Sequence, residues 1–322
     1  MRRCLPLVAR LALALASACS GGAPSSATTA TGFVVIPVAE PSSTPASRSD
    51  PSPAAPAAPV REPPLPAPSV PLATALRDGI MAESAGSSGL DADLLRQGRE
   101  LETSRDFAGA RKAYFELITK APGSPLVPYA YLAFADLFFD EAEQDPSKLP
   151  LAQQAYQKVL SYPPPANLAY AFAWYRLGVV ASKLGDDARA LDAQRKAIAA
   201  VNQYASLPVA ARLAETARHE LVVAYARAGD PQRAIPFFRN VDATDASVLV
   251  IALGREYLEH GMARELVGLY EAALAGASRD PALSTLCAAA DDGARTLAAR
   301  ADSQTATMLA RFQTRRRAAC GP

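Results

Sequence analysis

The sequence of 322 residues predicts an all-α fold, an α-solenoid of about five helical hairpins that follows a disordered segment rich in proline, alanine and serine. The first observation is a stripe of Trp174, Leu177, Gly178 and Ala181, which recur at offsets that place side chains on one face of a helix. The second is that similar stripes recur along the chain. The third is composition: residues 20–75 hold 13 of the 27 prolines and no lysine.

The stripe at Trp174 is followed by a turn and a second helix. Gly178 leaves room for the second helix to approach, and Ala190 is the small residue expected to enter that gap. Gly185 allows a tight turn between the two helices, because glycine adopts backbone conformations that other residues avoid. Asp186 or Asp187 can cap the second helix. This segment therefore predicts one antiparallel helical hairpin.

The pattern recurs in a frame of roughly 34 residues. A first unit begins at Asp91, with the small residue Gly98 and the closing residue Pro122, and a second begins at Pro128. The loop 141–150 of the second unit is about five residues longer than the pattern. The fourth and fifth units contain Leu221, Tyr225, Gly229, Ala234, Phe238 and Val241, then Leu253, Gly254, Tyr257, Gly261, Leu266, Tyr270 and Ala273. Val222 and Leu266 depart from the small residues expected there.

These units resemble tetratricopeptide repeats, in which large and small residues alternate so that two antiparallel helices interlock. The resemblance covers residues 91–280 and implies stacked helix pairs, followed by capping helices at 281–312 and a basic tail at 313–322. Five units exceed the minimum of about three needed to bury a continuous core.

The N-terminus predicts export. Residues 1–18 combine Arg2 and Arg3 with a short apolar run that only Arg10 interrupts, as in a secretory signal peptide. Cys19, after small residues, resembles the lipobox of bacterial lipoproteins, which implies lipidation of Cys19. Ser20 after the cysteine then favours the outer membrane, by resemblance to lipoprotein sorting. The alternative is ordinary cleavage at the Ala16-x-Ala18 site, with Cys19 incidental.

Residues 19–75 are expected to form a disordered tether. Such a proline-rich segment cannot bury enough apolar surface to offset the entropy that it would lose on ordering. Residues 33–36 (Phe-Val-Val-Ile) are its one apolar island, either a stray patch or a short partner-binding strand. Residues 76–90 are transitional and expected to form at most a loose helical turn.

Charge and cysteines add less. The net charge of +1 gives no global attraction to nucleic acid. The basic run 315–317 is expected to be a solvated tail, with contact to anionic lipid or cell wall as the lesser alternative. Cys287 and Cys320 either pair as a disulfide in an oxidising periplasm, or Cys287 is a small buried residue and Cys320 is free.

Catalytic motifs are absent from the sequence. His219-Glu220 starts a zinc-binding HExxH pattern, but Val223 occupies the place of the second histidine. His260 lies beside a turn glycine, and no phosphate-binding loop or nucleophile elbow occurs. We therefore expect no enzyme, no metal and no cofactor.

The expected working surface is the concave face of the repeats. By resemblance to tetratricopeptide arrays, the partner-binding residues of that face are Arg99, Tyr129, Phe139, Phe172, Tyr175, Lys183, His219, Arg227 and Arg255. Aromatic groups flanked by arginines are typical of protein-binding hot spots. The alternative is that some of these aromatics pack against a neighbouring turn.

An anchor followed by repeats resembles outer-membrane lipoproteins with tetratricopeptide repeats, and most of all the lipoprotein subunit of the β-barrel assembly machine. The resemblance implies a non-catalytic adaptor, lipid-anchored at the outer membrane and facing the periplasm, that binds protein partners in outer-membrane assembly, secretion, pilus or motility complexes. The long proline-rich tether departs from that family. The alternative is a tethered regulator of peptidoglycan synthases or hydrolases.

Overall fold

The computed structural model describes residues 71–72, 74–76, 79, 88–204, 209–275, 282–299 and 301–321. The chain divides into two compact units, 1–62 and 63–322, and all described residues belong to the second. Every regular element in these ranges is a helix, so the all-α prediction is confirmed for them. The predicted signal peptide, Cys19, the apolar residues 33–36 and nearly all of the proline-rich tether lie outside the described residues.

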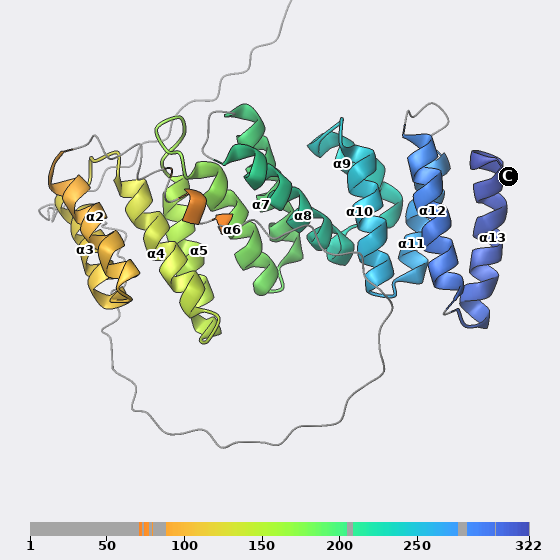
Figure 1. Cartoon of the computed structure of the whole chain (residues 1–322), viewed down its shortest axis with the longest axis horizontal. Helices are drawn as coiled ribbons and strands as arrows, with labels where there is room; N and C mark the ends of the chain where they lie inside the picture. The colour runs from red at the N-terminus through yellow and green to blue at the C-terminus, as the bar shows by residue number, and fades with distance from the viewer. Residues whose placement is uncertain are drawn as a thin grey trace, which may run out of the picture. The chain divides into compact units, whose positions relative to one another are not determined.

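Five helical pairs follow one another in the part of the chain that the structure describes (Figure 1). They are α2 (Leu90–Thr103) with α3 (Phe107–Lys120), α4 (Val127–Glu141) with α5 (Leu149–Leu160), α6 (Tyr170–Lys183) with α7 (Asp187–Gln203), α8 (Ala210–Ala228) with α9 (Ala234–Val241), and α10 (Ala246–Glu259) with α11 (Ala263–Ala275). Two further helices, α12 (Leu283–Ala298) and α13 (Ser303–Cys320), complete the unit. Short 3₁₀ helices η1 (Pro146–Lys148) and η2 (Pro231–Arg233) precede α5 and α9. Each pair packs against the next, and the first helices α6, α8, α10 and α12 also contact one another in succession.

The turns within the pairs follow the expected chemistry. Gly185 has φ of +76°, a conformation that glycine adopts without strain. Of the two predicted caps, Asp186 is the one used: its side chain accepts a hydrogen bond of 3.0 Å from the backbone N–H of Arg189. Asp106 caps α3 in the same way, through the N–H of Gly109. Local sequence therefore ends one helix and starts the next at both turns.

Three pairs share one packing device. The glycine of the first helix faces a side chain of the second helix that lies 16 residues later: Gly98 faces Tyr114, Gly178 faces Gln194, and Gly254 faces Tyr270. A Cβ atom placed on these glycines would lie 2.2 to 2.3 Å from an atom of that side chain. Each glycine therefore provides the space that a large side chain fills.

In the third pair, the residue that fills the gap at Gly178 differs from the one expected. The gap at Gly178 is filled by Gln194, whose amide donates a hydrogen bond of 3.1 Å to the backbone oxygen of Tyr175. Ala190, expected in that gap, instead belongs to a small buried cluster with Ala181 and Ala224. Ala190 thus joins α7 to both α6 and α8 through close contact of small side chains.

The core consists of two large apolar clusters. One extends along the chain from Leu76 to Ala214, and the other from Ala197 to Phe312. Trp174 and Tyr175 of α6 are partly buried and pack against both clusters. The third pair therefore links the two halves of the core.

The N-terminal end of the described chain is more ordered than expected. Residues 72 and 74–76 are helical, and Leu76 is only 1% exposed within the first cluster. Leu72 is partly buried against the same cluster. The spacing of these two leucines puts both on one helical face, so the predicted disordered segment stops short of residue 75.

The C-terminal end also differs from the prediction. Residues 313–320 continue α13 and do not form a separate tail. Arg315 forms a hydrogen-bonded ion pair of 2.7 Å with Glu271, and Arg316 forms one with Asp291. Carboxylates on α11 and α12 therefore pair with two of the three arginines of the basic run.

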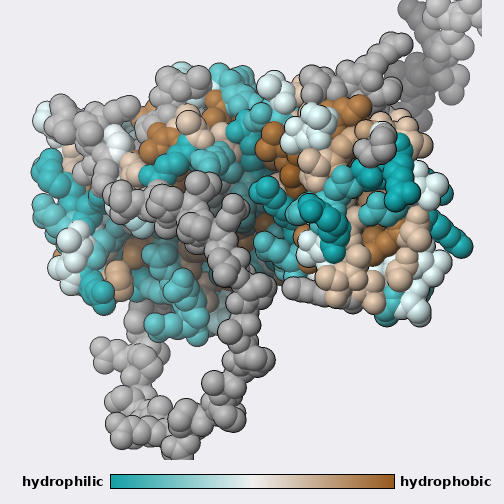
Figure 2. All heavy atoms as spheres, turned by 45° about the vertical axis from the view of Figure 1, so that its right-hand side comes forward, coloured by the Kyte–Doolittle hydropathy of each residue, from teal (hydrophilic) through white to brown (hydrophobic). Residues whose placement is uncertain are grey.

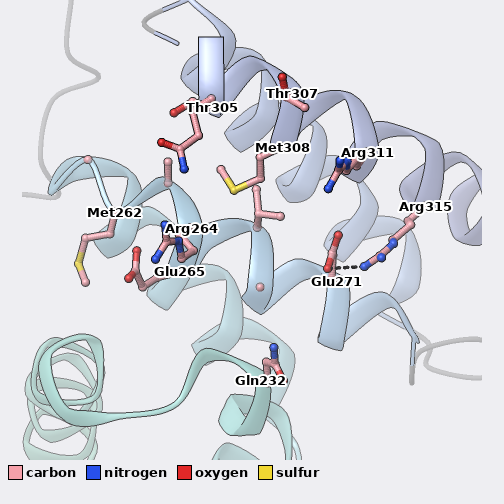
Figure 3. A pocket seen from close by; sticks show the side chains of 15 residues that line it. Gln232, Met262, Arg264, Glu265, Glu271, Thr305, Thr307, Met308, Arg311 and Arg315 are labelled. Carbon is pink, nitrogen blue, oxygen red and sulfur yellow. Dashed lines mark hydrogen bonds and ion pairs between the residues drawn. The ribbon is translucent and has the colours of Figure 1, made fainter. Parts of the chain in front are cut away.

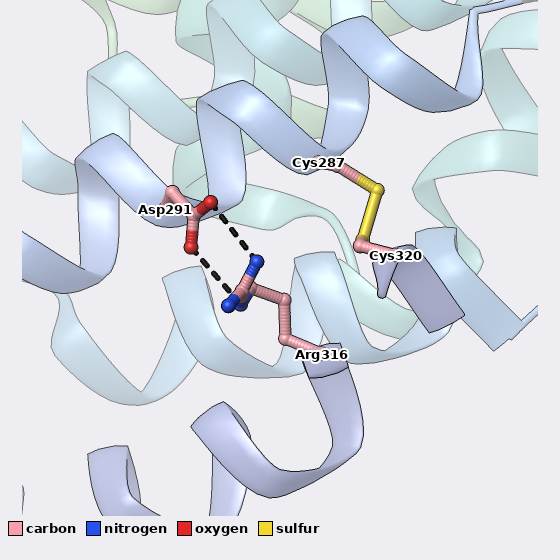
Figure 4. The surroundings of a disulfide bond; sticks show 4 residues. All are labelled: Cys287, Asp291, Arg316 and Cys320. Carbon is pink, nitrogen blue, oxygen red and sulfur yellow. Dashed lines mark hydrogen bonds and ion pairs between the residues drawn. A yellow bond between two sulfur atoms is a disulfide. The ribbon is translucent and has the colours of Figure 1, made fainter. Parts of the chain in front are cut away.

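A disulfide joins the last two helices. Cys287 of α12 and Cys320 of α13 are bonded, with their Cα atoms 5.9 Å apart, so the pairing alternative is the one the structure shows (Figure 4). The ion pair of Arg316 with Asp291 lies beside it (Figure 4).

Candidate functional site

The aromatic members of the predicted partner surface lie inside the protein. Phe172 is 1% exposed, Phe139 is 8% exposed and Tyr129 is 9% exposed. The Tyr129 hydroxyl donates to the backbone oxygen of Ala166 and accepts from the N–H of Leu168, at 3.3 Å each. Tyr175 is partly buried. The expectation of exposed aromatic anchors was therefore wrong for the first three, and the alternative of internal packing describes them.

Arg176 of α6 explains why the rings turn inward. Its guanidinium carbon lies 4.5 Å from the centre of the Phe139 ring and 5.2 Å from that of Phe172. Such contacts are favourable because the face of an aromatic ring attracts a cation. The two rings thus surround a cation of this chain and not one of a partner.

A buried polar network extends from this arginine. Tyr156 of α5 donates a hydrogen bond of 2.6 Å to Oδ1 of Asp136 on α4, and Arg176 Nε lies 3.5 Å from the same oxygen. Asp136 is 2% exposed, and the Arg176 side chain is 14% exposed. Burial, with the Asp136 carboxylate beside it, raises the pKa of Tyr156 well above its usual value. Burial opposes the charge on Arg176, but Tyr156 and Asp136 outweigh it and raise its pKa. The network therefore joins three helices, α4 through Asp136, α5 through Tyr156 and α6 through Arg176.

Sequence analysis missed Arg176, although a signal was present. It is the one charged side chain in the otherwise apolar and aromatic run 170–181. A charge within such a run needs a partner when the helix is buried. Nothing in the sequence paired Asp136 with Arg176, because the two lie on helices of different pairs.

The charged members of the predicted surface are exposed, with one exception. Lys183, His219, Arg227 and Arg255 are exposed on the successive first helices α6, α8 and α10, whereas Arg99 is partly buried. Arg227 lies 3.6 Å from a carboxylate oxygen of Asp187. We call Lys183, His219, Arg227 and Arg255 the cationic set. The predicted surface thus separates into buried aromatics and an exposed cationic set.

Carboxylates accompany the cationic set. Glu220 lies beside His219, with 3.9 Å between the nearest oxygen and Nδ1, and raises the pKa of His219. Glu256 and Glu259 of α10 also raise the pKa of His219. The His219 side chain is 73% exposed, so water screens these interactions. The surface around His219 is therefore of mixed charge.

An open cavity of about 870 Å³ lies at the other end of the described chain, between η2, α11 and α13 (Figure 3). Its lining residues are Gln232, Gly261, Met262, Ala263, Arg264, Glu265, Val267, Gly268, Glu271, Gln304, Thr305, Thr307, Met308, Arg311 and Arg315. None of the predicted partner residues is among them. Two lining residues are named in the sequence analysis: Gly261, in the fifth unit, and Arg315, in the basic run.

The surface that includes the C-terminal helices is chemically mixed. Figure 2 shows hydrophilic side chains over most of the visible face, with hydrophobic side chains gathered in patches between them. Exposed large hydrophobic residues in the described chain are Leu90, Phe107, Phe115, Leu184 and Val248. Most of these lie on α2 and α3, at the opposite end of the sequence from the cavity.

Groups for metal chemistry are not assembled in the described part of the chain. No cluster of three or more histidine, cysteine or carboxylate side chains could hold a metal ion among these residues. None of the helices described combines the length and apolar character needed to cross a membrane. No protein-family model matches the chain, and no curated protein matches it.

Proposed function

We propose that the protein is a non-catalytic scaffold of the bacterial cell envelope that binds other proteins through tetratricopeptide-like repeats. The observation that carries the proposal is the shared packing device of three helical pairs, in which a glycine receives the side chain that lies 16 residues later. The same offset in separate pairs is what a repeated unit requires. Helical arrays of this kind present extended surfaces suited to binding proteins.

The cationic set is the proposed partner surface. Its members come from α6, α8 and α10, whose successive contacts bring them into one layer. Charged groups at a protein surface steer association and select partners by complementary charge. We therefore propose that an acidic surface of a partner contacts Arg227 and Arg255, and that the buried aromatics only support the layer.

The envelope location rests on two features. The apolar N-terminal run that ends at Cys19 resembles a lipoprotein signal. The disulfide between Cys287 and Cys320 supports an oxidising compartment, because such bonds persist mainly outside the cytosol. In this proposal a lipid on Cys19 anchors the protein to the outer membrane, with the repeats in the periplasm.

Affinity capture tests the scaffold. The full-length lipidated protein is compared with the double variant Arg227→Glu/Arg255→Glu, and with Arg295→Glu as a control on α12, where the Arg295 side chain is 75% exposed. We expect the double variant to recover at least about tenfold less of the partner, with no change for the control. Equal recovery by all three proteins would contradict the proposed surface.

The identity of the captured proteins separates the two function classes. Subunits of barrel-assembly or secretion complexes support the adaptor, whereas peptidoglycan synthases or hydrolases indicate the regulator. Membrane fractionation of Cys19→Ala tests the anchor separately. If that variant still sediments with membranes after a high-salt wash, the lipid anchor is refuted and the scaffold proposal is unaffected.

A further inference from the structure

The cavity between α11 and α13 has an adaptable apolar floor. Met262 lines it from the turn before α11, Met308 lines it from α13, and the buried Val267 lines it from α11. Methionine side chains are flexible and polarisable, and they recur at surfaces that accept varied apolar partners. Gly268 adds space, since a Cβ atom placed there would meet only Pro231, at 3.9 Å. We call this cavity, with its lining side chains, the C-terminal groove.

The walls of the C-terminal groove carry more positive than negative side chains, with three arginines against Glu265 and Glu271. Helix α13 carries four arginines and no carboxylate along its 18 residues. Arg311 and Arg315 line the groove from α13, and Arg264 lines it from α11 (Figure 3). Arg315 is neutralised by Glu271 at 2.7 Å. No ion pair involves Arg264 or Arg311 within the described ranges, so their charges are available to a partner.

The basic wall is fixed in position. Leu309 and Phe312 of α13 are 5% and 2% exposed and pack into the second core cluster. The disulfide from Cys320 to α12 and the ion pair of Arg316 with Asp291 hold the far end of the same helix (Figure 4). A groove with fixed walls binds at lower entropic cost than one that must be assembled.

We propose that the C-terminal groove binds an acidic amphipathic helix of a partner protein. The apolar face of that helix contacts Met262, Val267 and Met308, and its carboxylates pair with Arg264 and Arg311. An amphipathic helix set in an apolar groove is a common mode of peptide recognition, and the volume of about 870 Å³ suits several anchoring side chains. The groove shares no residue with the cationic set, so this inference is independent of the proposed partner surface.

Peptide titration tests the inference on the intact mature protein. The probe is a fluorescent synthetic helix with glutamate on one face and leucine and methionine on the other. A lysine-for-glutamate version and an all-polar acidic version serve as comparison peptides. We expect saturable binding of the first peptide only, because the groove supplies both positive charge and an apolar floor.

Matched variants locate the site. Arg311→Glu should weaken binding of the acidic amphipathic peptide by about tenfold or more, whereas Arg317→Glu, on the same helix but outside the groove, should change it by less than about twofold. Met308→Gln should also weaken it by several-fold. Circular dichroism confirms that each variant is folded, and both arginine variants carry the same net charge.

Four outcomes would overturn the inference. They are no saturable binding, equal binding of the lysine peptide, equal losses from Arg311→Glu and Arg317→Glu, or a concentration-dependent dimer of the free protein that Arg311→Glu dissociates. The last result would assign the groove to a second copy of the chain. Because the cationic set is intact in these variants, failure here leaves the proposed function untouched.

Discussion

Helix α4 buries 11 of its 15 residues, whereas α13 buries only Leu309 and Phe312 among its 18 residues. The difference follows from their places in the chain: α4 packs against α3 and α5 and reaches Arg176 of α6, while the main contacts of α13 are with α11 and α12. An inner helix is held by buried surface, to which the hydrophobic effect contributes most. A terminal helix lacks that surface, and here a disulfide and ion pairs supplement it.

The comparison also shows where charge can be placed. Asp136 in α4 is buried, accepts a hydrogen bond from Tyr156 and forms an ion pair with Arg176, so its removal leaves both partners without their acceptor or counter-charge. The ion pair of Arg315 on α13 is largely exposed, and exposed pairs contribute little stability. The same kind of contact is therefore essential in one helix and dispensable in the other.

Breaking the buried pair should produce the largest effect. Asp136→Ala removes the partner of Arg176 and Tyr156, and we expect it to lower the free energy of unfolding by about 3 to 5 kcal/mol. Urea unfolding followed by circular dichroism measures this. The double variant Asp136→Leu/Arg176→Met is the control, since replacing both charges with apolar groups should restore most of the loss. A single-variant loss below about 1 kcal/mol would mean that the network is not structural.

Removing the disulfide should have the next largest effect. Cys320→Ser should destabilise the protein by about 2 to 4 kcal/mol, because it frees a loop of 33 residues in sequence. In hydrogen exchange, the amide exchange rates should rise mainly in α13, because this helix has few buried residues to hold it. Reductant should reproduce the effect in the parent protein and leave the variant unchanged. Exchange that rises equally in α4 would contradict the contrast drawn between the two helices.

Substituting Gly98 with alanine tests whether the glycine is required for the close packing of α2 against α3. Gly98→Ala would place its Cβ atom 2.2 Å from the Tyr114 ring, which is fully buried. Overpacking costs about 1 to 3 kcal/mol, and the gain in helix propensity offsets about 1 kcal/mol of it. Thermal unfolding should therefore show a net loss. Gly268→Ala, also within a helix but with only Pro231 at 3.9 Å from the added Cβ atom, should be neutral or stabilising. The same loss at both positions would rule out the packing explanation.

The smallest expected effect is the pH dependence of stability that comes from His219 on α8, a helix between α4 and α13 in the chain. Glu220 raises the pKa of His219 above its ordinary 6.5. A raised pKa means that protonation favours the folded state, so this stabilisation is complete below the unfolded pKa and is lost as pH rises through the folded one. NMR titration of the His219 ring checks the direction. Glu220→Gln should bring the midpoint down towards 6.5, and an unchanged midpoint would exclude Glu220 as the cause.

The sequence predicted the helices and their pairing because both depend on local periodicity and turn chemistry. Gly185, Asp186 and the small residues Gly98 and Gly254 all act within one helical pair, where position in the chain determines position in space. The disposition of the aromatics was not predictable in this way. Phe172 faces inward because of Arg176 and its contacts with α4, and such contacts between pairs leave no periodic signal.

The C-terminal groove lay beyond prediction for a related reason. Its floor comes from Met262, in the turn before α11, and from Met308 on α13, and α12 separates these two in the chain. Neither belongs to a motif. The disulfide had been one of two alternatives, because 33 residues separate the cysteines and sequence alone gives no distance between them.

The longer turn between α4 and α5 has a practical consequence for labelling. Its extra residues are taken up by η1, which Asp145 caps through the N–H of Ser147 and which contains no buried residue. Contacts in this array run mainly between neighbouring helices, so a change of length at an exposed turn need not alter the spacing elsewhere. A fluorophore-binding tag inserted at Ser147 should therefore report on the protein in living cells while the helical pairs keep their packing.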